Sequence, residues 1–365
     1  MLVGLAGPLE IAADSRDPER GSEAAREFLH PDEPEEDTAR LRFFDDRVTL
    51  AFFLELVYEY SDTEETDDKD SGSLHDIFLD TAEFDLHIMP FEAIEARVVA
   101  GIENVHKNGD DTEGFLDEAS LRLRYPGAPF YLVGGKRTQP FGVFEDRLIS
   151  GTITEDLYEI VKVGATAGFA PEALGLDLAF TAYRGQEISQ NLQSEDTHEF
   201  AEGRRDRQEN GSYIASLQLE PWGEWLFLSA SYNNEPGDGR RNQSLGGALT
   251  LAAWDCNLDF EYIAALTRED GENEEENLEK AWFVGLSWEL QEDFEVATRY
   301  EHFDDDNEED QEEVVNYRWL AGFNYAFTDY TTLSVEYRYS DFEQESDSDA
   351  VGSQNELIIQ IALEY

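Results

Sequence analysis

Apolar and polar residues alternate along most of this chain. In the C-terminal segment 356–365, for example, Leu357 and Ile359 fall on one face of an extended chain, while Gln360 and Glu364 fall on the other. Such period-two alternation predicts β-strands that place one face against an apolar medium and the other against a polar one. Helical periodicity fits these segments less well, so we expect an all-β protein.

Sixteen such segments follow one another from Arg47 to the C-terminus, and the connections between them alternate in length. Seven connections are short turns and eight are long, mostly acidic loops. This arrangement predicts an up-and-down topology with both termini at the rim of the short turns. The predicted strands cover residues 47–60, 74–89, 92–104, 115–125, 130–137, 159–170, 175–184, 212–220, 224–233, 242–254, 257–267, 280–290, 293–303, 314–326, 329–342 and 355–365.

Two folds are compatible with strands of this kind, a soluble β-sandwich and a membrane-spanning barrel. The strand lengths match the roughly 9–11 residues that a tilted strand needs to cross a hydrocarbon layer. Aromatic residues gather at strand ends, as at Trp222, Trp254 and Tyr365, where interfacial girdles lie. Charged residues occupy mid-strand positions that a dry sandwich core would not tolerate. The sequence therefore predicts a 16-stranded antiparallel up-and-down transmembrane β-barrel, with a sandwich as the alternative.

The chain divides into two predicted parts. Residues 1–41 are interpreted as a leader remnant followed by a flexible or partly helical periplasmic segment, because the apolar start is followed by a stretch rich in Glu, Asp, Arg, Ala and Pro. The start lacks the basic residues and the longer apolar core of a complete secretory signal. Residues 42–365 form the predicted outer-membrane barrel, which includes a distinctive loop at 138–158.

Composition narrows the range of functions. The 365 residues include 83 acidic and 26 basic side chains, and the formal net charge of −57 excludes nucleic acid as a general partner. A hydrophobic content of 41% argues against disorder over the whole chain. The single cysteine, Cys256, excludes an intrachain disulfide framework. The longest uncharged run, 242–254, is shorter than the roughly 18 residues of a transmembrane helix.

The acidic residues gather in loops, most densely in 61–70, 269–279 and 304–313. Blocks of like charge solvate themselves and rarely pack. We interpret them as a hydrated surface adapted to high salt, and therefore expect a halophilic bacterium as the source. Divalent-cation binding is the alternative, although no run has the ligand spacing of a calcium loop.

A barrel of sixteen strands leaves an aqueous channel, so inward-facing basic residues are candidates for contact with solutes. The predicted channel-lining and ligand-orienting residues are Arg97, Arg122, Arg124, Lys136, Lys162, Arg299, Arg318 and Arg338. The first four lie on three consecutive strands and should form a basic ladder on one wall. Two interpretations are open. The ladder guides anions or orients a ligand, or it neutralises inward acids such as Glu55, Asp85 and Glu95.

The connection 138–158 is too apolar for a loop that meets only water. We expect its apolar residues to pack inside the barrel, where its acids would face the basic ladder across a constriction. Opposed charges at a constriction create a transverse field that selects solutes. Folding over the outer rim is the alternative. The predicted residues of this constriction loop are Pro140, Phe141, Gly142, Phe144, Glu145, Asp146, Glu155, Asp156 and Glu159.

The residues around this loop resemble a known family. The stretch 131–160 (YLVGGKRTQPFGVFEDRLISGTITEDLYEI), followed by 163–169 (VGATAGF), is similar to the LbtU-type siderophore porins of Gram-negative bacteria. The shared elements include a glycine-rich strand that ends in a lysine, a Pro-Phe-Gly turn and a Thr-Glu-Asp-Leu run. The resemblance implies an outer-membrane barrel for the uptake of iron–siderophore complexes. Phosphate-selective porins carry a similar turn, so a general or anion-selective porin is the alternative.

The sequence contains no enzymatic constellation. Its six histidines lack metal-ligand spacing, and neither a Gly-x-Ser-x-Gly motif nor a phosphate-binding loop occurs. We therefore expect a channel for passive or ligand-assisted uptake of small solutes, without a cofactor, in the outer membrane of a Gram-negative bacterium. The expected partners are outer-membrane lipid or lipopolysaccharide and a small solute, for which a ferric siderophore is the first candidate. Further copies of this chain are also expected partners, in a homo-oligomer. A non-conducting structural barrel and a barrel hydrolase are the alternatives.

Overall fold

The computed structural model describes most of the predicted barrel. The predicted N-terminal segment 1–41 lies outside the described residues except for Leu41, and so does most of the three acidic runs. The described ranges are 41–44, 47–65, 72–107, 112–144, 147–194, 211–237, 240–268, 278–304, 315–342 and 351–365.

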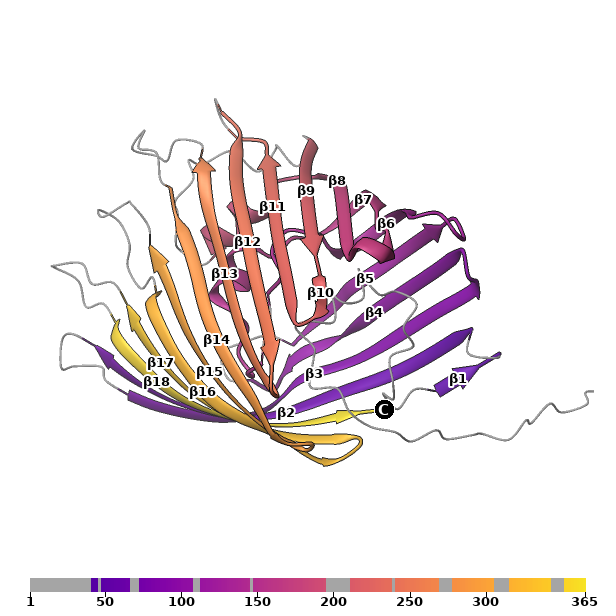
Figure 1. The fold of residues 1–365 in the computed structure, drawn as a ribbon. Helices are drawn as coiled ribbons and strands as arrows, with labels where there is room; N and C mark the ends of the chain where they lie inside the picture. Colours follow the sequence, from indigo (N-terminus) through magenta and orange to yellow (C-terminus); the bar gives the residue numbers. More distant parts are fainter. Residues whose placement is uncertain are drawn as a thin grey trace, which may run out of the picture.

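Sixteen antiparallel strands form one closed ring (Figure 1). Each ring strand pairs with its neighbours along the chain, and the last strand pairs with the first, so the ring has no free edge. Closure excludes the two separate sheets of a sandwich and confirms the predicted 16-stranded barrel. The ring strands are β2 (Val48–Glu65), β3 (Gly72–Phe91), β4 (Ile94–Val105), β5 (Glu113–Arg124), β6 (Phe130–Thr138), β7 (Val161–Phe169), β8 (Leu176–Arg184), β9 (Gly211–Leu219), β11 (Leu226–Glu235), β12 (Asn242–Ala253), β13 (Cys256–Thr267), β14 (Lys280–Gln291), β15 (Phe294–Asp304), β16 (Val315–Thr328), β17 (Thr331–Phe342) and β18 (Val351–Glu364).

Alternation sets the two faces of the wall, as β13 illustrates. Leu258 and Tyr262 are 39% and 40% exposed on the outside, whereas Glu261 and Ile263 are 1% and 0% exposed on the inside. Large apolar side chains such as Leu258 are thus exposed on the outer face, where a water-soluble protein would place polar ones. The outer face is therefore suited to a hydrocarbon environment and the inner face to polar contacts.

One rim carries the short turns and the C-terminus. The backbone N–H of Tyr365 donates to the carbonyl of Phe52 at 2.8 Å, which fixes the C-terminus beside the start of β2 (Figure 1). Trp222 and Trp254, in turns of the same rim, are 74% and 90% exposed. Large exposed aromatic side chains at strand ends form the girdle expected where a wall meets a membrane interface.

Five small elements accompany the ring in the described ranges. The strand β1 (Leu41–Phe43) pairs with β2, and β10 (Pro221–Glu224) and the 3-10 helix η1 (Glu172–Leu174) lie in connections of the short-turn rim. The helices α2 (Ile153–Tyr158) and α3 (Glu187–Ser194) lie in the connections that follow β6 and β8. Within the described ranges, no helix has the length and apolar character needed to span a membrane.

Candidate functional site

The connection between β6 and β7 runs inside the barrel. Its side chains Phe141, Leu157 and Tyr158 are at most 3% exposed and pack against inward residues of the wall such as Ile263 and Phe303. A loop that buries this much apolar surface gains the same hydrophobic stabilisation as a protein core. The complete cluster comprises Phe141, Phe144, Ile153, Leu157, Tyr158, Ile160, Tyr183, Ile188, Leu192, Ile214, Ile263, Ala281 and Phe303, with Val315 packed against it.

Local sequence sets the shape of this loop. Gly142 has a φ of +81°, which favours glycine. A Cβ atom at this position would lie only 2.3 Å from the ring of Phe144, so a side chain does not fit there. Thr152 begins α2 with a capping box: its hydroxyl accepts from the backbone N–H of Glu155 at 3.1 Å, and the carboxylate of Glu155 accepts from the N–H of Thr152. The helix ends at Glu159.

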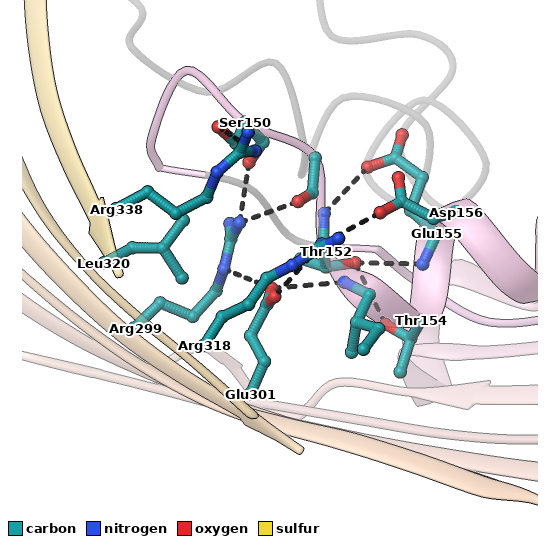
Figure 2. A network of polar contacts seen from close by, with 12 residues as sticks. Ser150, Thr152, Thr154, Glu155, Asp156, Arg299, Glu301, Arg318, Leu320 and Arg338 are labelled. Carbon is teal, nitrogen blue, oxygen red and sulfur yellow. Dashed lines mark hydrogen bonds and ion pairs between the residues drawn. The ribbon is translucent and has the colours of Figure 1, made fainter. Parts of the chain in front are cut away.

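Two wall carboxylates hold the middle of the loop. Glu261 of β13 accepts hydrogen bonds from the backbone N–H of Val143 at 2.7 Å and from the hydroxyl of Thr154 at 2.8 Å. Glu301 of β15 accepts from the N–H of Ile153 at 3.1 Å (Figure 2). Both carboxylates are at most 1% exposed. Hydrogen bonds to a charged acceptor in a buried site are stronger than neutral ones, so these contacts fix the loop backbone.

A third carboxylate holds the loop tip. Glu336 of β17 accepts from the backbone N–H of Ile149 at 2.8 Å and from the N–H and hydroxyl of Ser150 at 3.0 and 2.5 Å. Arg338 donates to the same hydroxyl at 3.0 Å, and Arg299 donates to the carbonyl of Ser150 at 2.6 Å (Figure 2). The tip therefore satisfies its backbone donors and acceptors on charged side chains of the wall.

Three predicted channel-lining residues belong to this anchoring network. Arg299 pairs with Glu301 at 2.7 Å, and Arg318 pairs with Asp156 of the loop at 3.1 Å (Figure 2). Arg338 pairs with a carboxylate of β18 at 2.5 Å. All three face inward, and their charges hold the loop against β15–β17.

The other predicted basic group lies on the wall formed by β3, β4 and β5. Arg97 pairs with Asp85 at 3.1 Å, and Glu95 pairs with Arg124 at 2.9 Å and with Arg122 at 4.0 Å. The acids are thus on the same wall as the arginines, which agrees with the interpretation that the ladder neutralises inward acids. His87 adds a contact to Glu95 at 3.0 Å.

This wall is more exposed than the Arg299–Glu301 pair of β15, whereas Arg318 and Arg338 on β16 and β17 are exposed to a similar degree, 16% and 22%. The side chains of Arg97 and Arg124 are 21% and 17% exposed, whereas those of Arg299 and Glu301 are 3% and 0% exposed. We refer to Asp85, Glu95, Arg97, Glu118, Arg122 and Arg124 as the balanced wall, because each arginine has a carboxylate within 4.0 Å. In the described part of the chain, no group of three His, Cys, Asp or Glu side chains is suited to a metal ion.

The predicted inward orientation of Lys136 is wrong. The register pairs Lys136 with Val163, which is 68% exposed on the outer face, while the next residue, Arg137, pairs with the inward Lys162. The predicted inward position therefore belongs to Arg137, which sequence analysis missed. The reason is that Gly134–Gly135 precede the two basic residues and carry no side chain that would show the phase of the alternation.

The predicted loop acids do not all lie where expected. Asp156 pairs with Arg318 on β16 and not with the ladder of β4 and β5, and Glu155 is used in the cap of α2. Glu145 and Asp146 lie outside the described residues. The expected opposition of Asp156 to the ladder is therefore wrong, because α2 turns this side chain toward β16.

Glu159 closes the loop at its return to the wall. Its carboxylate accepts from the hydroxyl of Thr138 at 2.8 Å, so the two ends of the loop are joined. Burial raises the pKa of the Glu159 carboxyl, and the hydroxyl contact opposes that rise only in part. Its backbone carbonyl accepts from the side-chain amide of Asn191 at 2.9 Å.

Asn191 belongs to α3, an element that sequence analysis missed. Ile188 and Leu192 of α3 are each 1% exposed in the same hydrophobic cluster as α2. Glu187 forms an ion pair with Lys162, a predicted channel-lining residue of β7. The signal was present: Ile188 and Leu192 are four residues apart, which is helical spacing, in a connection expected to be merely solvated.

A closed barrel with an apolar exterior, a polar interior and an inward-folded loop defines an outer-membrane channel of the porin class. The family model described as Gram-negative porin matches residues 161–345, just over half of the 365 residues. The chain belongs to the Gram-negative porin family. It is therefore a non-enzymatic channel of the Gram-negative outer membrane.

Solved porin structures share the fold. The anion-selective porin from Comamonas acidovorans has a TM-score of 0.62 at 9% identity, over 87% of this chain and 99% of that chain. OmpT of Vibrio cholerae has a TM-score of 0.57 at 13% identity, over 89% and 100%. OmpF of Salmonella typhi, in complex with daunomycin, has a TM-score of 0.58 at 13% identity, over 88% and 99%. No curated protein matches the sequence.

Proposed function

We propose that small hydrophilic solutes diffuse passively along the balanced wall, past the loop 138–158. The observation that carries this proposal is that Arg97 and Arg124 of the balanced wall are 21% and 17% exposed, whereas Arg299 and Glu301 of β15, which hold the loop, are 3% and 0% exposed. The carboxylates that bind the loop are on β13, β15 and β17, so the loop narrows the barrel from the opposite side.

The experiment is single-channel recording in a planar bilayer. A passive channel gives stepwise, ohmic conductance that rises with salt concentration. Barrels that insert but give no conductance steps would contradict the proposal and favour a non-conducting structural barrel. A barrel hydrolase would instead cleave an ester or phospholipid reporter, so the same preparation is assayed for hydrolysis.

For the solute, we propose a ferric siderophore. The support is the resemblance of residues 131–160 to LbtU-type siderophore porins. The test is uptake of labelled ferric siderophore by iron-limited cells with and without the gene, with a sugar of similar size as the control solute. Equal uptake by the two strains would remove the siderophore from the proposal without affecting passive conductance.

A phosphate- or anion-selective porin is the second candidate. Arg97, Arg122 and Arg124 favour it, because three guanidinium groups line one wall. Asp85, Glu95 and Glu118 oppose it, because they offset these charges within 4.0 Å. A reversal potential in a salt gradient separates the two: a balanced wall gives weak selectivity, and an anion-guiding wall gives a clear anion preference.

Two further properties are proposed for the whole molecule. The net charge of −57 supports adaptation to high salt, which predicts that folded barrels survive heating better as salt concentration rises.

A trimer form of V. cholerae OmpT, with a TM-score of 0.53 at 14% identity over 88% of this chain and 100% of that chain, supports a homo-oligomer. Native mass spectrometry in detergent measures the oligomeric state directly.

A further inference from the structure

Two arginines lie near Gly211 on the outer face of the barrel, at the rim of the long loops. Arg184 is the last residue of β8, is exposed, and lies in the outward series of Leu178 and Phe180. Across the β8–β9 pair it lies directly opposite Gly211. Arg241, which precedes β12, donates from Nη2 to the carbonyl of Gly211 at 2.9 Å. Gly211 therefore lies beside the backbone of Arg184 and in contact with the guanidinium of Arg241.

Arg241 is held in place by neutral partners. Besides its bond to Gly211, its Nη2 donates to the carbonyl of Asn234 at 3.0 Å, and its Nε donates to the side-chain oxygen of Asn234. Its guanidinium lies 5.7 Å from the centre of the Tyr213 ring. A guanidinium fixed by carbonyls and an aromatic ring keeps its full positive charge, since none of these partners is an anion.

An aromatic surface continues below the two arginines. Tyr213 is 36% exposed, and its ring centre lies 6.0 Å from that of Phe180 and 6.2 Å from that of Tyr232. The space above Gly211 is open, because a Cβ atom placed there would meet no other atom within 4 Å. The cluster of Arg184, Gly211, Tyr213 and Arg241 therefore has a cationic top, an aromatic base and room for a ligand group.

The charge of this cluster is unusual for the molecule. The chain carries a net charge of −57, and another outward basic residue of the rim, Lys280, is paired with Asp304 at 2.8 Å. Within the described ranges, neither Arg184 nor Arg241 forms an ion pair. Two outward cations that have no carboxylate partner among the described residues suit an anionic ligand.

The position of the cluster identifies the source of the anion. The long loops of an outer-membrane barrel are extracellular, so this rim lies at the headgroup level of the outer leaflet. The cluster faces outward, toward lipid, and tyrosine side chains favour this interfacial depth. We propose that Arg184 and Arg241 bind a phosphate group of an outer-leaflet lipid headgroup, while Tyr213 contacts the adjoining sugar or acyl chain. This site is independent of the channel.

The test measures lipid binding to the full-length folded barrel in detergent. Diphosphorylated lipid A and its dephosphorylated form are titrated, and bound lipid is counted by native mass spectrometry. We expect the wild type to prefer the phosphorylated form and Arg184→Gln to lose about tenfold in affinity, in keeping with the loss of a charge-assisted bond. Lys280→Gln is the matched control on the same rim and should bind as the wild type does.

A second variant guards against a folding defect. Gly211→Glu places a carboxylate in the open space beside Arg241 and next to Arg184 in the strand pair, and should abolish binding of phosphorylated lipid while the barrel stays folded. Equal affinity for the two forms of lipid A, or unchanged binding by both variants, would overturn the proposal. Full displacement of the lipid by inorganic phosphate would also overturn the proposal, because free phosphate would then be the ligand. Loss of a dimer or trimer in Gly211→Glu without loss of lipid would overturn it too, because a second copy of this chain would then occupy the site.

Discussion

The carboxylate of Glu336 binds both the backbone N–H and the hydroxyl of Ser150, although the two residues are 186 positions apart. Glu336 is fully buried in the wall, and Ser150 lies at the tip of the loop. The contact shows how the loop stays inside the barrel: its backbone donors, which would otherwise be unsatisfied away from water, are bound by charged side chains of the strands.

Removal of this anchor should free the loop tip. Glu336→Ala removes three hydrogen bonds to a charged acceptor, each of which contributes about 1.5–3 kcal/mol, so the loop should leave its position for a measurable fraction of time. We expect a larger mean single-channel conductance with more current noise. The mean conductance of Glu336→Gln, which keeps an acceptor, should lie between those of the wild type and Glu336→Ala. Gln360→Ala, an inward position on β18, is the control, and an equal effect of that change would assign the result to the wall in general.

The balanced wall makes a paired prediction about ion selectivity. Arg122→Gln combined with Arg124→Gln leaves Glu95 with His87 as its partner, so the reversal potential in a salt gradient should shift toward cations. Glu95→Gln should shift it toward anions. Both shifts should shrink at high ionic strength because salt screens the wall. Unchanged reversal potentials in both variants would show that solutes do not pass along this wall.

The register of β6 can be tested directly. Arg137→Gln should lower the anion-to-cation permeability ratio, because Arg137 faces inward beside Lys162. Lys136→Gln should leave the ratio unchanged, because Lys136 faces outward with Val163. The two changes remove the same charge one residue apart, so each serves as the control for the other. A larger effect of Lys136→Gln would restore the original interpretation of this strand.

Glu159 should make the loop sensitive to pH. Burial raises the pKa of its carboxyl in the folded state above the ordinary value of 4.5. Below pH 4.5 both states are protonated, and as the pH rises the unfolded state releases its proton first. The folded state therefore loses stability as the pH rises from 4.5 through the raised pKa of the folded state. Glu159→Gln should flatten this dependence of the thermal unfolding midpoint, whereas Glu92→Gln, at an exposed turn, should not.

We expect apolar packing of the loop to contribute as much to the stability of its inward position as its polar anchors do. Leu157→Ala in α2 leaves a cavity beside α3 and should cost about 2–5 kcal/mol of unfolding free energy, or release the loop before the barrel unfolds. Leu174→Ala, at a position that is 64% exposed, is the matched control. Protease accessibility of the loop in the folded barrel distinguishes local release from global unfolding. No change in accessibility or in stability would mean that the cluster is not needed to hold the loop.

Much of the fold could be predicted because its signal is local. Each strand shows its faces through residues two positions apart, and the lengths of the connections reveal the order of the rims. Where that signal is missing, the prediction failed. Gly134–Gly135 conceal the phase that distinguishes Lys136 from Arg137, and α3 was hidden because two apolar residues in a polar loop make a weak helical signal.

The sequence by itself determined the number of strands, their order around the ring, and which residues face inward on nearly all of them. Only the tertiary structure decided which inward charges meet. Closure of the ring brings Glu261, Glu301 and Glu336 against a loop more than a hundred residues earlier in the chain, and the turn of α2 directs Asp156 to Arg318. Alternation reports the side of the wall on which a side chain lies, but the partner across the lumen depends on the curvature of the whole barrel.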